Sequence, residues 1–84
     1  MPKQERVTTR RAAALDLVMQ ELDASYKTFP NCFNSPHEAR GVIDEEAEEL
    51  HEAIRANDRM NVRREAAQLA AMALRTLIDL DLVK

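Results

Sequence analysis

Three glutamates whose carboxylates could share one ion lie in the middle of the chain, at Glu45, Glu46 and Glu49. Oxygen atoms are the ligands that Mg²⁺ prefers, and Mg²⁺ usually keeps several waters, which leaves room for substrate phosphates. Carboxylates that crowd one edge of a helix repel one another, and a divalent cation relieves that repulsion. An acidic run of this kind can also be the solvated face of a helix, and the spacing alone leaves both interpretations open.

The helical positions of these residues favour the first interpretation for Glu46. At about 100° per residue, Glu45, Glu49 and Glu38 lie within roughly 40° of one another, while Glu46 lies about 100° from Glu45 and among the apolar residues. A carboxylate that faces a core must be paired, protonated or bound to a cation. An arginine from the next helix could also neutralise Glu46. The opposite side is expected to be solvated: Asp44, Glu48, His51 and Glu52.

A second polar stripe follows on the next predicted helix, with Glu65, Gln68, Met72, Arg75 and Asp79 at spacings of three and four. If this stripe faces Glu46 and Glu49, Glu65 can complete a metal shell, whereas Gln68 offers only a neutral amide oxygen. Arg75 could hold a phosphate or pair with an acid. Asp79 lies about 16 Å along the helix from Gln68, too far to supply an acid there.

The elements that must position these residues are helices. Apolar residues recur at spacings of three and four, and no strand-like alternation occurs. We predict an all-α, antiparallel bundle of three main helices in a single domain over residues 1–84, with helices at about 9–24, 36–56 and 61–80. Ser35, Pro36 and Glu38 form a capping box with Pro at the first helical position. Thr8 or Thr9 is expected to cap the first helix, and Asp58 or Asn61 the third.

Size and composition predict self-association. A chain of 84 residues is marginal as a monomer, and a second copy is a common remedy. The third helix is apolar over most of its circumference, which indicates burial on more than one side. We therefore expect homo-oligomerisation, as a homodimer or a homotetramer, to complete the bundle.

Charge, apolar content and cysteine content indicate which classes of function and which location are favoured. The net charge of −3 disfavours a DNA-binding protein, which would carry a basic excess. Residues 1–11 are polar and basic without an apolar run behind them, so we expect no signal peptide, and no segment is long enough to span a membrane. Cys32 has no partner for an intrachain disulfide, which suits a reducing compartment. We therefore expect a cytoplasmic location.

Residues 37–50, which contain His37-Glu38-Ala39, Val42-Ile43 and Glu45-Glu46, resemble the MazG-like all-α nucleotide pyrophosphohydrolase superfamily, and so does the segment Glu65-Ala66-Ala67-Gln68. The signature of that superfamily is Glu-Glu-x-x-Glu on one helix and Glu-x-x-Asp on the next. The resemblance extends over about residues 29–80. Within the superfamily, the chain is most similar to short members of the phage and bacterial type. Gln68 departs from the signature, because the superfamily has Asp there.

The resemblance implies an enzyme that hydrolyses a nucleoside triphosphate to the monophosphate and pyrophosphate, with Mg²⁺, or in its place Mn²⁺, as the cofactor. It implies catalytic roles for Glu45, Glu46 and Glu49, one of which orients or deprotonates the attacking water, and a metal site formed by these three with Glu65 and Gln68. Loss of the anionic ligand at Gln68 would weaken metal binding. The alternative is a non-catalytic helical module of the same fold that binds a nucleotide or a protein.

The remaining candidates concern the substrate. Phe29 and Phe33 lie in the predicted connection between the first two helices, where they either stack on a nucleobase or pack into the core. Lys27 and Arg75 are candidates for phosphate contact, and Glu38 lies on the acidic stripe beside Glu45.

Overall fold

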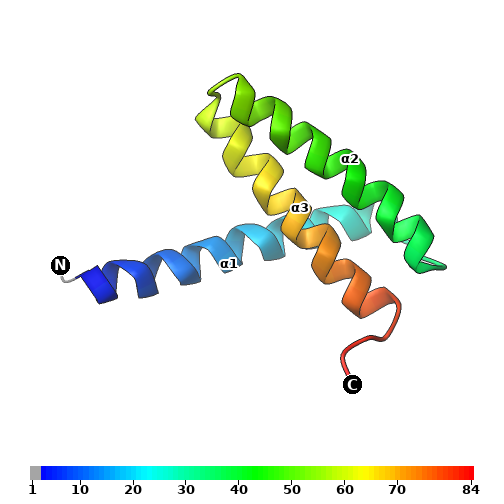
Figure 1. The fold of residues 1–84 in the computed structure, drawn as a ribbon. Coiled ribbons are helices and arrows are strands. Elements are labelled where there is room, and N and C mark those ends of the chain that lie inside the picture. The colour runs from blue at the N-terminus through cyan, green and yellow to red at the C-terminus, as the bar shows by residue number, and fades with distance from the viewer. Residues whose placement is uncertain (1–2) are drawn as a thin grey trace.

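The computed structural model describes residues 3–84 and contains three helices (Figure 1). These are α1 (Lys3–Thr28), α2 (Pro36–Arg55) and α3 (Arg59–Asp79). No strand occurs within the described residues, so the prediction of an all-α fold with three main helices is confirmed. In the same part of the chain, no helix combines the length and the apolar character needed to cross a membrane.

Helix α1 is longer than the predicted 9–24 at both ends. Its first turns consist largely of good helix formers such as Lys, Gln, Glu and Arg, so the helix begins before the predicted threonine cap. At the other end it continues to Thr28 because Phe29 precedes Pro30, and a residue before proline is disfavoured in the helical conformation. Helix α2 begins at the predicted residue, and the other bounds of α2 and α3 differ from the predicted ones by one or two residues.

The predicted capping box of α2 is confirmed for the Ser35 side chain, but the Glu38 side chain has a different partner. Ser35 Oγ accepts a hydrogen bond from the Glu38 N–H at 3.2 Å, and Pro36 occupies the first turn. The Glu38 carboxylate does not return to Ser35. It accepts from the backbone N–H of Asn34 at 3.1 Å and from the Asn34 side chain at 3.2 Å. This contact ties the connection before α2 to the first turn of the helix.

A three-residue turn sets the register of α2 against α3. Asn57 has a φ of 54°, a left-handed conformation that Asn tolerates better than most residues. The Asn57 N–H donates to Ile54 O and the Asp58 N–H to Ala53 O, both at 3.1 Å, which closes α2 with a Schellman motif. Asp58 then caps α3, because its side chain accepts from the Asn61 N–H. Asp58 thus takes part both in the end of α2 and in the beginning of α3.

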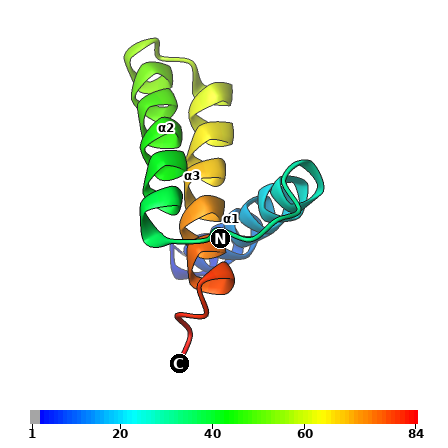
Figure 2. The same cartoon turned by 90° about the vertical axis from the view of Figure 1, so that its right-hand side faces the viewer.

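The helices do not all lie side by side. Helices α2 and α3 form an antiparallel pair, whose buried alanines allow a close approach (Figure 2). Helix α1 crosses α3 and does not run side by side with α2, so the prediction that successive helices are antiparallel neighbours is wrong for α1 and α2 (Figure 1). The buried alanines are Ala39 and Ala53 of α2 and Ala67 and Ala71 of α3.

The core lies where α1 crosses α3. Leu22 of α1 packs with Ala71 and Met72 of α3, and half-buried residues surround them. Large apolar side chains that are fully buried are few, so this core contributes less than that of a larger domain. The surrounding residues are Val18, Tyr26, Phe33, Val42, Ile43 and Leu74.

Candidate metal centre

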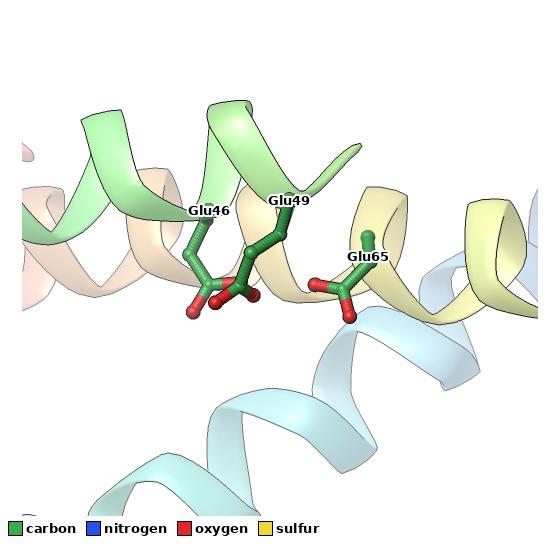
Figure 3. A group of neighbouring side chains, drawn as sticks. All are labelled: Glu46, Glu49 and Glu65. Carbon is green, nitrogen blue, oxygen red and sulfur yellow. The ribbon is translucent and has the colours of Figure 1, made fainter. Parts of the chain in front are cut away.

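Glu46 and Glu49 of α2 and Glu65 of α3 form an acidic cluster, in which one carboxylate oxygen of each lies within 4.8 Å of the others (Figure 3). Glu46 and Glu49 are three residues apart and therefore project from the same side of α2. The short turn between the helices places Glu65 opposite them. The sequence analysis placed Glu65 beside Glu46 and Glu49 if the two helices faced each other, and the three carboxylates do lie together. Glu45 is not a member of the cluster.

The three carboxylates differ in their exposure to solvent. Glu65 is buried, with 8% of its surface exposed, Glu46 is half-buried and Glu49 is exposed. Burial, followed by the charges of Glu49 and Glu65, raises the pKa of Glu46 from 4.5 to about 7. The pKa of Glu49 is also raised, first by a hydrogen bond with Glu65. The metal-free cluster therefore carries less than its full negative charge near neutral pH.

A single arginine provides little compensation for this charge. Arg64 Nε lies 3.5 Å from Glu65 Oε1, but more than half of the Arg64 side chain is exposed. Ion pairs of this kind contribute between zero and about 1 kcal/mol, because water screens the charges. The cluster thus keeps the repulsion that a bound cation would relieve.

Gln68, on the turn of α3 that follows Glu65, lies against the same carboxylates. With its amide turned so that the nitrogen faces the acids, it donates to Glu46 Oε2 at 3.2 Å and to Glu65 Oε2 at 3.0 Å. In this orientation Gln68 holds two carboxylates together as a hydrogen-bond donor. To serve as a metal ligand, it must rotate its amide and present its oxygen.

A cavity of about 440 Å³ adjoins the cluster. Glu45, Glu46 and Gln68 line it from α2 and α3, and Phe29 and Phe33 line it from the connection between α1 and α2. Acidic groups and aromatic rings therefore face one space. The volume is within the range of pockets that hold small ligands.

The predicted substrate residues have different surroundings. Phe29 lines the cavity and is 68% exposed, whereas Phe33 also lines it but is half-buried and packs against the core. Phe33 therefore packs into the core, which is one of the two alternatives, whereas the ring of Phe29 is open to solvent. Glu38 lines the cavity and holds Asn34. Lys27 is exposed and does not line it.

Arg75 lines the cavity, but all three nitrogens of its guanidinium donate hydrogen bonds to the protein itself. Its surface is 1% exposed, and its Nε donates to Asp79 Oδ2 at 3.0 Å. Its Nη1 donates to Ser25 Oγ, and its Nη2 donates to the carbonyl oxygens of Phe29 at 2.6 Å and Asn31 at 2.8 Å. Of the two roles that the sequence allowed, the ion pair is the one observed.

Asp79 completes a buried network that the sequence did not reveal in full. It accepts hydrogen bonds from the Tyr26 hydroxyl and the Phe33 N–H, and Arg75 lies over both aromatic rings. Burial alone would raise the pKa of Asp79, but these hydrogen bonds and the charge of Arg75 outweigh it and lower that pKa. The spacing of four between Arg75 and Asp79 was the available signal. Nothing in the sequence pointed to Tyr26.

The raised pKa of Glu46 predicts how the stability of the metal-free protein depends on pH. The folded carboxyl has a pKa of about 7 against 4.5 in the unfolded chain, so between these values the folded state holds a proton that the unfolded state releases. Stability must then fall as pH rises through 7. We expect the thermal midpoint measured in EDTA to drop between about pH 5 and pH 8, and Glu46→Gln to flatten this decrease. A midpoint that rises over this range would contradict the assignment.

The donor set fits a hard divalent cation. All the converging atoms are oxygens, the carboxylates repel one another, and a cavity beside them can admit a phosphorylated ligand. The case for function rests on these residues, because no protein-family model, no curated protein and no solved structure matches this chain.

Proposed function

We propose that this chain is a Mg²⁺-dependent nucleoside triphosphate pyrophosphohydrolase of the MazG-like kind. The observation that carries the proposal is the convergence of Glu46, Glu49 and Glu65 beside a cavity with aromatic walls. Glu46, Glu49 and Glu65 would hold Mg²⁺ or Mn²⁺. The ion would supply positive charge next to the phosphate oxygens. Gln68 would add an amide oxygen after rotation.

The other residues then have distinct tasks. Glu45 lines the cavity outside the acidic cluster, where its carboxylate would take the proton of the attacking water. The oxygen of that water would bond to the α-phosphorus as the bond to the bridging oxygen breaks, and pyrophosphate would leave. Phe29 would stack on the base, since it is the more exposed of the two cavity aromatics.

The same proposal includes self-association and a cytoplasmic location. The core formed by one copy is small for a stable domain, which favours a homodimer or homotetramer. Cys32 is an exposed free thiol, as suits a reducing compartment.

Gln68 favours a second candidate, a non-catalytic module of the same fold that binds a nucleotide or a protein. An amide nitrogen that bridges two carboxylates already lowers their repulsion. A site in which Gln68 replaces the fourth acid therefore needs a bound cation less than a site with four carboxylates would.

Pyrophosphate release from a panel of canonical and modified nucleoside triphosphates separates the two candidates. We expect release that depends on Mg²⁺ or Mn²⁺ and that is lost in Glu46→Gln. Isothermal titration of Mg²⁺ into both proteins tests the metal site independently of turnover. No release at high enzyme and metal concentration, with Mg²⁺ still bound, would favour the binding module.

Gln68→Asp is expected to strengthen Mg²⁺ binding and to raise any turnover. The substitution replaces a donor with a fourth carboxylate next to Glu46 and Glu65, so the metal-free protein should also become less stable near neutral pH. Gln20→Asp, on the exposed surface of α1, is the matched control for the added charge. Unchanged metal affinity in Gln68→Asp would show that position 68 lies outside the metal shell.

A further inference from the structure

Arg75 holds one end of the cavity, about 10 Å along α3 from Gln68 and the acidic cluster. Ser25, Phe29 and Asn31 line this end, and the guanidinium of Arg75 donates a hydrogen bond to each of them. The bonds to the Phe29 and Asn31 carbonyl oxygens, 2.6 and 2.8 Å long, come from the same nitrogen, Nη2. One buried side chain of α3 therefore fixes the backbone of the connection between α1 and α2.

The guanidinium is itself held in place. Its carbon lies 4.0 Å from the centre of the Tyr26 ring and 5.2 Å from that of the Phe33 ring. Its Nε donates to Asp79, which in turn accepts from the Phe33 N–H. With 1% of its surface exposed, Arg75 has neither the space nor a free nitrogen with which to change partners. This end of the cavity is therefore ordered before any ligand binds.

Phe29 differs from the residues of this network because its ring is open to solvent while its backbone is fixed. The residue is 68% exposed. Its N–H donates to Ser25 O at 2.8 Å, and its carbonyl oxygen accepts from Arg75. An exposed aromatic ring at the wall of a cavity offers a flat surface to a planar ligand. A ring that is carried on a fixed backbone costs less to order on binding than one on a mobile loop.

We propose that Arg75 is a positioning residue, which holds Phe29 where its ring can stack on the base of a nucleotide whose phosphates lie at the acidic cluster. This inference rests on the proposed function, because that function supplies the nucleotide. Arg75 acts through the backbone of Phe29, since all its donors are engaged. A lysine could still pair with Asp79, but its single nitrogen lacks the planar fork that reaches Ser25 and both carbonyl oxygens.

Fluorescence tests the positioning without any ligand. The chain contains no tryptophan, so Phe29→Trp introduces a single indole at the cavity wall. We expect the anisotropy of this indole to fall when Arg75→Lys is added, because its backbone loses two anchors. Ser25→Ala, which removes one contact of Arg75, should lower it less and replaces Arg75→Lys if that variant loses its helical circular dichroism. The matched control is Arg40→Lys, in the exposed pair with Asp44, which should change nothing. An anisotropy that neither Arg75→Lys nor Ser25→Ala lowers would overturn the proposal.

Binding of the base is measured by isothermal titration with the α,β-methylene analogues of ATP, GTP, CTP and UTP in the presence of Mg²⁺. For the analogue that the wild type binds most tightly, Phe29→Ala should raise Kd about 10-fold, as for the loss of one base–aromatic stack. Arg75→Lys should raise Kd about 2–10-fold, the usual cost of ordering one side chain. Combined with Phe29→Ala it should add nothing, because it acts through that ring. Inorganic pyrophosphate, which has no base, should bind all four proteins equally.

The possible results separate this inference from the proposed function. Coupled effects of Arg75→Lys and Phe29→Ala support the positioning role even in a protein that releases no pyrophosphate, a result that contradicts the hydrolase alone. Additive effects in a protein that does release pyrophosphate contradict the positioning role alone, and so does weaker binding of inorganic pyrophosphate in Arg75→Lys. A wild type that binds none of the four analogues overturns both.

Discussion

Asp79→Ala should destabilise the protein by about 3–5 kcal/mol, the usual loss when one partner of a buried ion pair is removed. The side chains of Arg75 and Asp79 are almost completely buried, so the variant leaves a guanidinium without its counter-charge. The Tyr26 hydroxyl and the Phe33 N–H lose their acceptor as well. For a domain of this size the thermal midpoint should fall by roughly 12–40 °C. Urea denaturation, followed by circular dichroism, measures the change.

The chain contains a matched control for this substitution. Arg40 and Asp44 also form an ion pair at a spacing of four within a helix, but both side chains are largely exposed. Asp44→Ala should therefore cost about 0.5 kcal/mol or less. Tyr26→Phe removes one hydrogen bond to a buried charge and should cost an intermediate amount, about 1.5–3 kcal/mol. Similar losses in Asp79→Ala and Asp44→Ala would mean that the buried network does not stabilise the fold.

Glu46→Gln should have opposite effects on the metal-free and the metal-bound protein. Without metal, the variant lacks a half-buried charge that its neighbours repel, so near pH 8 it should be more stable than the wild type by about 1–2 kcal/mol, once screening by solvent is allowed for. With Mg²⁺ at about 100 times its dissociation constant, the wild type should gain about 2.7 kcal/mol. The variant should gain almost nothing, because loss of a direct ligand costs more than the roughly 10–100-fold typical of outer-shell residues.

Glu48→Gln serves as the control, because Glu48 is exposed and lies on the solvated face of the same helix. It removes one charge from α2 without touching the acidic cluster, so its stability and its gain with Mg²⁺ should match those of the wild type. Thermal melts with EDTA and with Mg²⁺ give both values. An equal gain with Mg²⁺ in Glu46→Gln and in the wild type would exclude Glu46 as a ligand.

Much of the acidic cluster could be predicted from the sequence, because its determinants are local. The spacing of Glu46 and Glu49 fixes their common side on α2, and the signals at Ser35 and Asp58 fix where the helices begin. Given a short turn between antiparallel helices, Glu65 must then lie opposite. The orientation of the Gln68 amide was not predictable, because it depends on the hydrogen bonds offered by two acids on different helices.

The path of α1 could not be predicted, because it depends on contacts between residues far apart in the sequence. Arg75 binds the connection between α1 and α2 through the Phe29 and Asn31 carbonyls, and Tyr26 meets Asp79 across the core. These contacts direct α1 across α3 and away from α2. Helical periodicity identifies which face of α1 is apolar, but it carries no information about the angle at which that face meets its partner.

The most direct test of the central claim is the anomalous scattering of Mn²⁺ in crystals grown with a non-hydrolysable nucleoside triphosphate. A cation held by Glu46, Glu49 and Glu65 should give an anomalous peak between the three carboxylates, with metal–oxygen distances of about 2.0–2.2 Å. The phosphates should lie in the cavity beside it. Crystals with well-defined nucleotide density but no anomalous peak at the acidic cluster would contradict the account.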